Sequence, residues 1–334
     1  MDLQKKALQV GAAAIACALL FRLAPGAVRK ALGFLDTREG ASLMLYLQTG
    51  HIVKGEAQTL PPETAATDPT IPPTTVQEVM APVLPSFSEA DAEGVTLRYH
   101  ASYDPNLSEL LCKPLSWDLT AQTPSVLIVH THTTESYTKS KGESYKESSS
   151  YRTLDEDYNM ISIGEALAAL LEDAGIGVIH ATEVHDHPSY SGSYVNSRKT
   201  VQKYLQEYPT IQLVLDLHRD AIDDGSGNQL GTTVKIDGRR CAQLMMVVGT
   251  DAGNRTHPNW QDNLALALKL HVMLERQTPG LCRSISFRTQ RFNQDLSPGA
   301  LLIEVGAAGN THEEALNAVD LLARGIIALA HGSQ

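Results

Sequence analysis

From about residue 94 onward, short apolar runs alternate with stretches of helical periodicity. The apolar runs are rich in aliphatic and β-branched residues and predict buried strands at 125–129, 177–180, 211–217, 245–249 and 300–305. Apolar stripes at helical spacing predict helices at 159–174, 197–206, 263–276 and 311–330. This alternation predicts an α/β domain with a largely parallel sheet that is flanked by helices on both faces.

The N-terminus carries a different pattern. Lys5 and Lys6 precede an uncharged run at 7–21, which Arg22 closes. At about 15 residues, this run is intermediate between a signal-peptide core and a full membrane span. Because Arg22 and Leu23 follow the run where small residues would mark a cleavage site, we interpret residues 1–34 as an uncleaved anchor in the cell membrane. A cleaved signal peptide and an ordinary buried helix are the alternatives.

Residues 35–93 link this anchor to the predicted folded part. The stretch is acidic and, from Thr59, rich in Pro, Thr and Ala, so it buries too little apolar surface to offset the entropy of ordering it. We predict an extended linker that holds a single folded domain, residues 94–334, off the outer side of the membrane.

Composition narrows the range of partners. The formal net charge is −11, and no strong basic field is available to neutralise phosphates, so we expect no nucleic-acid partner. The four cysteines are Cys17, Cys112, Cys241 and Cys282, and their scattered spacing matches neither a zinc ribbon nor a disulfide scaffold.

Candidate chemistry gathers at the ends of three predicted strands. His130 and His132 follow the first strand, His218 follows the third, and Glu304 lies in the last. In open α/β sheets, ligands bind beyond the carboxyl ends of the strands. Imidazole and carboxylate are the groups that hold a catalytic zinc with one position left for water. We therefore predict a metal-assisted hydrolase site at this edge of the sheet.

Five segments in order resemble the stage II sporulation protein P family. They are 130–137 (HTHTTESY), 152–159 (RTLDEDYN), 215–220 (LDLHRD), 258–264 (PNWQDNL) and 291–306 (RFNQDLSPGALLIEVG). The resemblance covers about 125–326. It implies the fold of the zinc-dependent N-acetylmuramoyl-L-alanine amidases and an amidase activity on peptidoglycan combined with endopeptidase activity. It further implies a role in septal wall thinning and engulfment during sporulation, alongside stage II sporulation proteins D and M.

The resemblance assigns site residues unevenly. His218 matches a zinc-binding histidine, and Glu304 matches the catalytic glutamate. The usual Gly-His-Gly-Gly is absent from the first motif, so the other zinc histidine is either His132, which we prefer, or His130. The carboxylate ligand also stays open. Spacing within the second motif favours Asp155, whereas Glu135 lies beside the two histidines.

Other polar residues near these motifs are candidates for supporting roles. Arg219 could stabilise the developing oxyanion of the reaction, although a surface ion pair is an alternative. Asp216 could orient a metal-bound imidazole. Three polar side chains just before the last strand could bind glycan or peptide carboxylates: Arg291, Asn293 and Gln294.

Three classes of function follow from these residues. The first is the amidase with endopeptidase activity. The second is a zinc peptidase that cleaves only stem peptides or cross-links. The third is a wall-binding scaffold without catalytic activity. Only the first would free peptide from glycan.

Overall fold

The computed structural model describes residues 85–331 except for 116, 121–123 and 254. These residues belong to one compact unit, Gln77–Gln334. The anchor predicted at 1–34 and most of the predicted linker lie outside the described residues. Among the residues that are described, no helix is both long and apolar enough to cross a bilayer.

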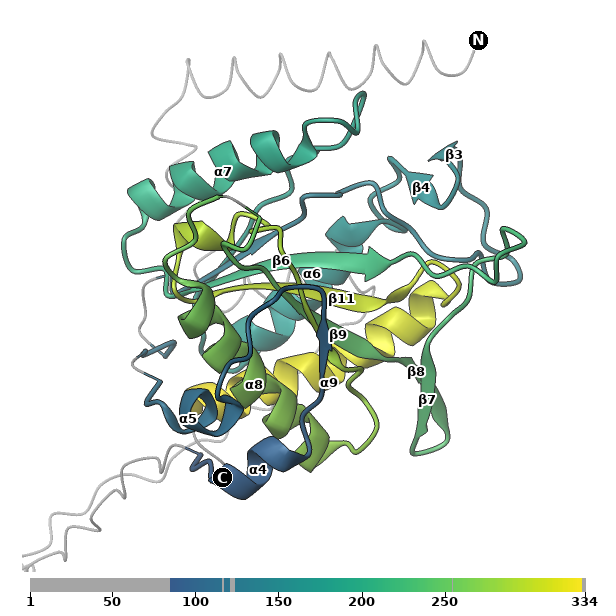
Figure 1. The fold of residues 1–334 in the computed structure, drawn as a ribbon. Coiled ribbons are helices and arrows are strands. Elements are labelled where there is room, and N and C mark those ends of the chain that lie inside the picture. The colour runs from purple at the N-terminus through teal and green to yellow at the C-terminus, as the bar shows by residue number, and fades with distance from the viewer. Residues whose placement is uncertain (1–84, 116, 121–123, 254, 332–334) are drawn as a thin grey trace, which may run out of the picture. The chain divides into compact units, whose positions relative to one another are not determined.

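The centre of the domain is a seven-stranded sheet in the order β1-β10-β9-β11-β6-β2-β5. Its middle strands β9, β11 and β6 are labelled in Figure 1. The strands are β1 (Leu97–Tyr99), β2 (Val126–Val129), β5 (Val178–His180), β6 (Leu213–Asp220), β9 (Leu244–Val248), β10 (Ile285–Phe287) and β11 (Ala300–Ala307). All neighbouring strands pair in parallel except β9 and β11. The predicted α/β class with a largely parallel sheet is confirmed.

One reversal distinguishes this sheet from an all-parallel one. The connection from β6 to β9 contains a hairpin of β7 (Thr233–Ile236) and β8 (Arg239–Ala242) and no helix. Parallel neighbours need a long crossover, usually a helix. Without one, β9 enters the sheet in the opposite direction and pairs antiparallel with β11. A second small sheet, β3 (Glu147–Ser149) with β4 (Arg152–Thr153), lies in the loop after β2.

Among the described residues, four long helices pack on the sheet, and three short helical segments accompany them. The long helices are α6 (Met160–Asp173), α7 (Ser193–Glu207), α8 (Trp260–Gln277) and α9 (His312–His331). The short segments are α4 (Glu89–Glu93), α5 (Leu107–Cys112) and the 3-10 turn η1 (Gln294–Leu296). Local sequence sets their ends: the Asn159 side chain accepts the Ile161 N–H at 2.8 Å to begin α6, and Gly175 follows its end with φ 80°.

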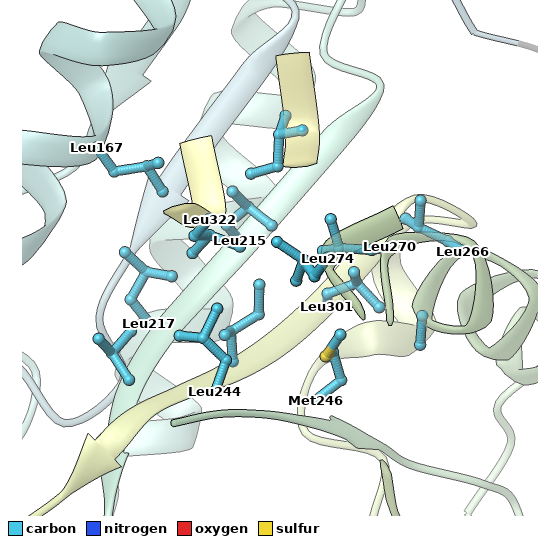
Figure 2. Close-up of a cluster of buried hydrophobic side chains, with 14 of the residues drawn as sticks. Leu167, Leu215, Leu217, Leu244, Met246, Leu266, Leu270, Leu274, Leu301 and Leu322 are labelled. Carbon is cyan, nitrogen blue, oxygen red and sulfur yellow. The ribbon is translucent and has the colours of Figure 1, made fainter. Parts of the chain in front are cut away.

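The helices divide between the two faces of the sheet. Leucine side chains of β6, β9 and β11 meet those of α6, α8 and α9 in the main core (Figure 2). On the opposite face, Val129 and Val214 pack against Val201 of α7. Successive strand residues point to opposite faces. Leu215 and Leu217 of β6 therefore enter the main core, whereas Asp216 and His218 lie on the face that α7 partly covers.

The end of the predicted linker is part of this fold. Residues 89–93 form α4, Ala92 is buried in the main core, and Asp91 pairs with Arg276 of α8 at 2.6 Å. Phe87 packs against the same core. The folded part therefore includes residues N-terminal to the predicted boundary at 94.

A buried lysine lies under this N-terminal segment. Lys269 of α8 is only 3% exposed, donates to the Leu111 carbonyl, and lies 4.9 Å from the Phe87 ring centroid. Burial lowers its pKa from 10.5 to about 8, because leaving water disfavours the charged form.

This lysine gives a prediction about stability. Between pH 8 and 10.5 the folded lysine has lost its proton and the unfolded one has not, so the free energy of unfolding rises with pH in this window. Relative to Lys269→Met, the wild type should gain about 2–3 kcal/mol between pH 7 and 10.5. Urea denaturation of both proteins at the two pH values measures the gain. Parallel changes in the two proteins would contradict the prediction.

Candidate active site

The pairing of β6 with β11 brings two predicted site residues together. His218 and Glu304 are Cα partners in the parallel register of these strands, so their side chains leave the same face of the sheet. His132 lies in the loop that follows β2, the strand on the other side of β6. All three line one cavity of about 320 Å³.

Two imidazoles and a carboxylate approach one another in this cavity. The rings of His132 and His218 lie 5.2 Å apart between centroids and are nearly perpendicular, and His218 Nδ1 lies 3.6 Å from Glu135 Oε2. The Nδ1 atom of His132 is buried and has no hydrogen-bond partner. Within the described part of the chain, however, no three His, Cys, Asp or Glu side chains form a group that could hold a metal as they stand.

Asp216 supports His218 from behind. Its Oδ1 atom lies 2.9 Å from His218 Nε2, and its carboxylate accepts hydrogen bonds from the Thr131 N–H at 2.8 Å and the Thr131 hydroxyl at 2.6 Å. Burial alone would lower the pKa of His218, but the carboxylates of Asp216 and Glu135 raise it well above its usual value. The surroundings of His218 therefore favour a positive charge.

Glu304 has the opposite character. Its Oε2 atom is buried without a hydrogen-bond partner. Burial raises the pKa of this carboxyl to about 8, and the nearby negative charge of Glu135 adds to the increase. A carboxyl of this kind can hold a proton near neutral pH and release it again, which is what a general acid and base requires.

Arg219 makes contacts that hold the loop of the site in place. Its side chain is 5% exposed and donates to the carbonyls of Ser136 at 3.0 Å and Tyr151 at 2.8 Å. It also lies 3.5 Å from Glu135 Oε1. Burial opposes ionisation of Glu135, but the Arg219 guanidinium and the His218 ring hold its pKa well below the usual range. These contacts occupy the guanidinium and fix the loop that carries Glu135.

A model of the stage II sporulation protein P family matches residues 64–327. The chain belongs to this family. The resemblance that the five motifs indicate is thereby confirmed. Stage II sporulation protein P of Bacillus subtilis (strain 168) is 30% identical over 210 residues, which are 59% of this chain and 49% of that protein. The chain thus spans about half the length of this curated relative.

Solved structures give weaker likenesses. The N-acetylmuramoyl-L-alanine amidase AmiC2 of Nostoc punctiforme is 14% identical, with a TM-score of 0.37 over 61% of this chain and 95% of that one. The CwlD amidase from Clostridioides difficile, solved in complex with the GerS lipoprotein, is also 14% identical, with a TM-score of 0.38 over 61% and 94% of the two chains.

In this member of the stage II sporulation protein P family, the alternative zinc ligands that the sequence leaves open lie in different parts of the structure. His130 is fully buried outside the cavity, with Nε2 2.9 Å from His180 Nε2 and Nδ1 3.2 Å from the Leu217 carbonyl oxygen. Burial, followed by the neighbouring His180, lowers its pKa to about 3. Asp155 is exposed in the loop before α6 and does not line the cavity. The structure therefore brings His132 and Glu135 to His218, but not the two alternatives.

The three predicted substrate-binding residues lie outside this cavity. Arg291 pairs with Asp295 at 3.1 Å. Asn293 donates to the Tyr194 carbonyl at 2.9 Å, and Gln294 is buried, with hydrogen bonds to the Gly249 N–H and the Val247 carbonyl. These contacts tie the loop before β11 to α7 and β9. In this structure, the three side chains therefore stabilise the loop.

The site also contains two aromatic residues that the sequence analysis did not predict. The Tyr190 hydroxyl lies 3.2 Å from His132 Nε2 and its ring stacks on the imidazole at 4.5 Å, whereas Tyr194 at the start of α7 packs edge-on against the same imidazole. Tyr190 is 57% exposed. The sequence feature that could have indicated them is the cluster SYSGSY just before a predicted helix. Its glycine, Gly192, has φ 139° and allows the chain to turn sharply into that helix.

The buried pair of Arg219 and Glu135 yields a stability prediction. Replacing Arg219 by Met leaves a buried carboxylate without one of its partners and should lower the free energy of unfolding by about 3 kcal/mol. Urea denaturation in the presence of a chelator measures the loss. Arg324→Met, which breaks the exposed pair with Asp320, serves as the control and should cost less than about 1 kcal/mol. Equal losses would contradict the structural role of Arg219.

Proposed function

We propose that this chain is a zinc-dependent peptidoglycan hydrolase with N-acetylmuramoyl-L-alanine amidase activity and an additional endopeptidase activity. The observation that carries the proposal is the gathering of His132, His218, Glu135 and Glu304 in one cavity at the carboxyl ends of parallel strands. Membership of the stage II sporulation protein P family supports it.

The donors are of the kind that zinc prefers. We assign His132, His218 and Glu135 as the residues that hold it, because two imidazoles and one carboxylate are a common ligand set of catalytic zinc. The unpartnered Nδ1 of His132 and the carboxylate behind His218 fit this assignment. As they stand, the three side chains do not form a group that could hold a metal ion. Zinc binding would therefore require them to move closer together. When bound, zinc supplies Lewis acidity toward water and the amide carbonyl.

Glu304 performs the proton transfers. We assign it as the base that accepts a proton from the attacking water and as the acid that returns the proton to the leaving nitrogen. Its buried, unpartnered Oε2 atom is free for both steps. Asp216 supplies a counter-charge beside the His218 ring, and Arg219 holds the Glu135 loop rather than acting on the substrate.

The cellular role is part of the same proposal. We infer that the domain works outside the cytoplasm, attached to the cell membrane by residues 1–34, and that it thins the septal wall during engulfment in sporulation. Stage II sporulation proteins D and M are the proposed partners. Family membership supports the role in sporulation, and the uncharged run at 7–21 between basic residues is the basis for the proposed attachment to the membrane.

Zinc quantification tests the ligand assignment. His132→Ala, His218→Ala and Glu135→Gln should each weaken zinc binding by at least about 100-fold, because direct ligands matter at least as much as the groups that orient them. His130→Ala and Asp155→Ala should keep it. Titration of the purified full-length proteins with zinc against a chelating indicator gives the affinities.

The control for the zinc titration is His187→Ala, which removes an exposed histidine and should change nothing. Zinc loss in Asp155→Ala with retention in Glu135→Gln would overturn the carboxylate assignment.

Product analysis tests the reaction. Glu304→Gln should retain zinc but lower the rate of wall hydrolysis by about 100-fold or more, since it removes the proton carrier. Glu313→Gln, on the exposed start of α9, is the matched control. Mass spectrometry of wall fragments decides among the functions. Glycan strands freed of peptide support the amidase, cleaved stem peptides alone support a peptidase, and an inactive wild type loaded with zinc supports a scaffold.

A further inference from the structure

The cavity extends from Glu304 across the sheet to its β1 edge. Arg98 of β1 pairs with Ser286 of β10, Ser286 with Val247 of β9, and Val247 with Leu302 of β11. Directly paired residues share a face of the sheet. These four side chains therefore continue the face that carries Glu304, and all of them line the cavity.

Five arginines line this cavity, and three of them are already paired. Arg152 contacts Glu135 and Asp186, Arg219 contacts Glu135, and Arg283 lies 2.8 Å from Asp220. The remaining two are Arg98, which is exposed, and Arg288, which follows β10.

Among the described residues, Arg98 and Arg288 form no ion pair and no side-chain hydrogen bond. They lie beside His100, whose pKa is lowered by partial desolvation and then by the positive charges of Arg288 and Arg98. Two neighbouring guanidinium groups without a counter-charge repel each other and attract an anion. A guanidinium binds a carboxylate through two parallel hydrogen bonds.

We propose that Arg98 and Arg288 form a carboxylate-binding subsite that holds an acidic group of the peptide portion of the substrate. This inference rests on the proposed function for the identity of the substrate. Neutral N-acetylated sugars offer no negative charge to these arginines, whereas a peptide can carry free carboxylates. The two arginines thereby assign the β1 side of the cleft to the peptide.

The spacing of the strands indicates how long a ligand must be to extend from Glu304 to the two arginines. Arg288 follows the second strand from β11 and Arg98 lies on the third, which separates their backbones from that of Glu304 by at least about 10 and 14 Å across the sheet, at roughly 4.8 Å per strand. An extended peptide needs at least about three or four residues to cover this distance. A small isolated anion could not connect the two ends of the cleft.

Binding of a muramyl peptide tests the subsite without catalysis. The probes are an N-acetylmuramoyl tripeptide with free carboxyl groups and the same compound with its carboxyl groups amidated, titrated calorimetrically into the full chain carrying Glu304→Gln. The free form should bind more tightly. Adding R98Q/R288Q should weaken binding of the free form about ten- to hundredfold and change binding of the amidated form less than about twofold.

Two further variants control for charge and for folding. R239Q/R324Q removes the same charge from β8 and α9 and should leave both affinities unchanged. R98K/R288K keeps the charge and should restore part of the preference for the free carboxylate. Circular dichroism confirms that each variant is folded.

The outcomes separate this inference from the proposed function. Equal affinity for the free and amidated probes, or an unchanged preference in R98Q/R288Q, would overturn the subsite even if the wall is hydrolysed. A preference for the free probe that depends on the two arginines would support the subsite even if no hydrolysis is found.

Discussion

The parallel pairing of β6 with β11 is the constraint on which the site depends. Its register places His218 opposite Glu304 and Asp216 opposite Leu302. Side chains alternate between the two faces of a strand, so a slip of one residue would turn His218 or Glu304 into the main core. The slip is prevented by the same alternation, because Leu215, Leu217 and Ile303 are fully buried against the helices on the other face. Apolar packing on one face thus fixes the chemistry on the other.

The loop after β2 completes the site. Burying its charged side chains costs free energy, and contacts made by the loop offset this cost. It carries the buried residues His132 and Glu135, and leaving a carboxylate in such a place without partners would cost several kcal/mol. Arg219 and Arg152 supply the opposite charge, and Arg152 is held in turn by Asp186 at 2.6 Å. The result is a network in which each buried charge has a partner, and the loop keeps its shape without regular secondary structure.

The sequence allowed much of this to be predicted, and alternation along strands explains both the success and the omissions. The long apolar runs of β2, β6 and β11 are visible in the sequence, as are the polar residues at their ends. Period two also explains why His130 differs from His132: Ile128 faces the main core, and His130 continues on that side. The strands β1 and β10 contain three residues each, and Arg98 and Ser286 interrupt their apolar pattern. No local signal revealed that they extend the sheet beside the site. The choice between Glu135 and Asp155 depended on tertiary contacts that spacing does not encode.

The two arginines of the cleft that have no ion pair among the described residues both lie at one of its ends. Three carboxylic side chains, Glu135, Asp220 and Glu304, line its β6–β11 end, where arginines pair with the first two, and the two unpaired arginines lie toward β10 and β1. Because the arginines at the first end are already paired with carboxylates, an acidic group on a ligand is attracted more strongly to the second end. A substrate whose cleaved amide is neutral and whose carboxylates lie several residues away would therefore bind preferentially in one orientation. The two unpaired arginines would thus determine which side of a scissile bond lies over β9 and β10, so that the subsite proposed for the peptide also sets the direction of the substrate.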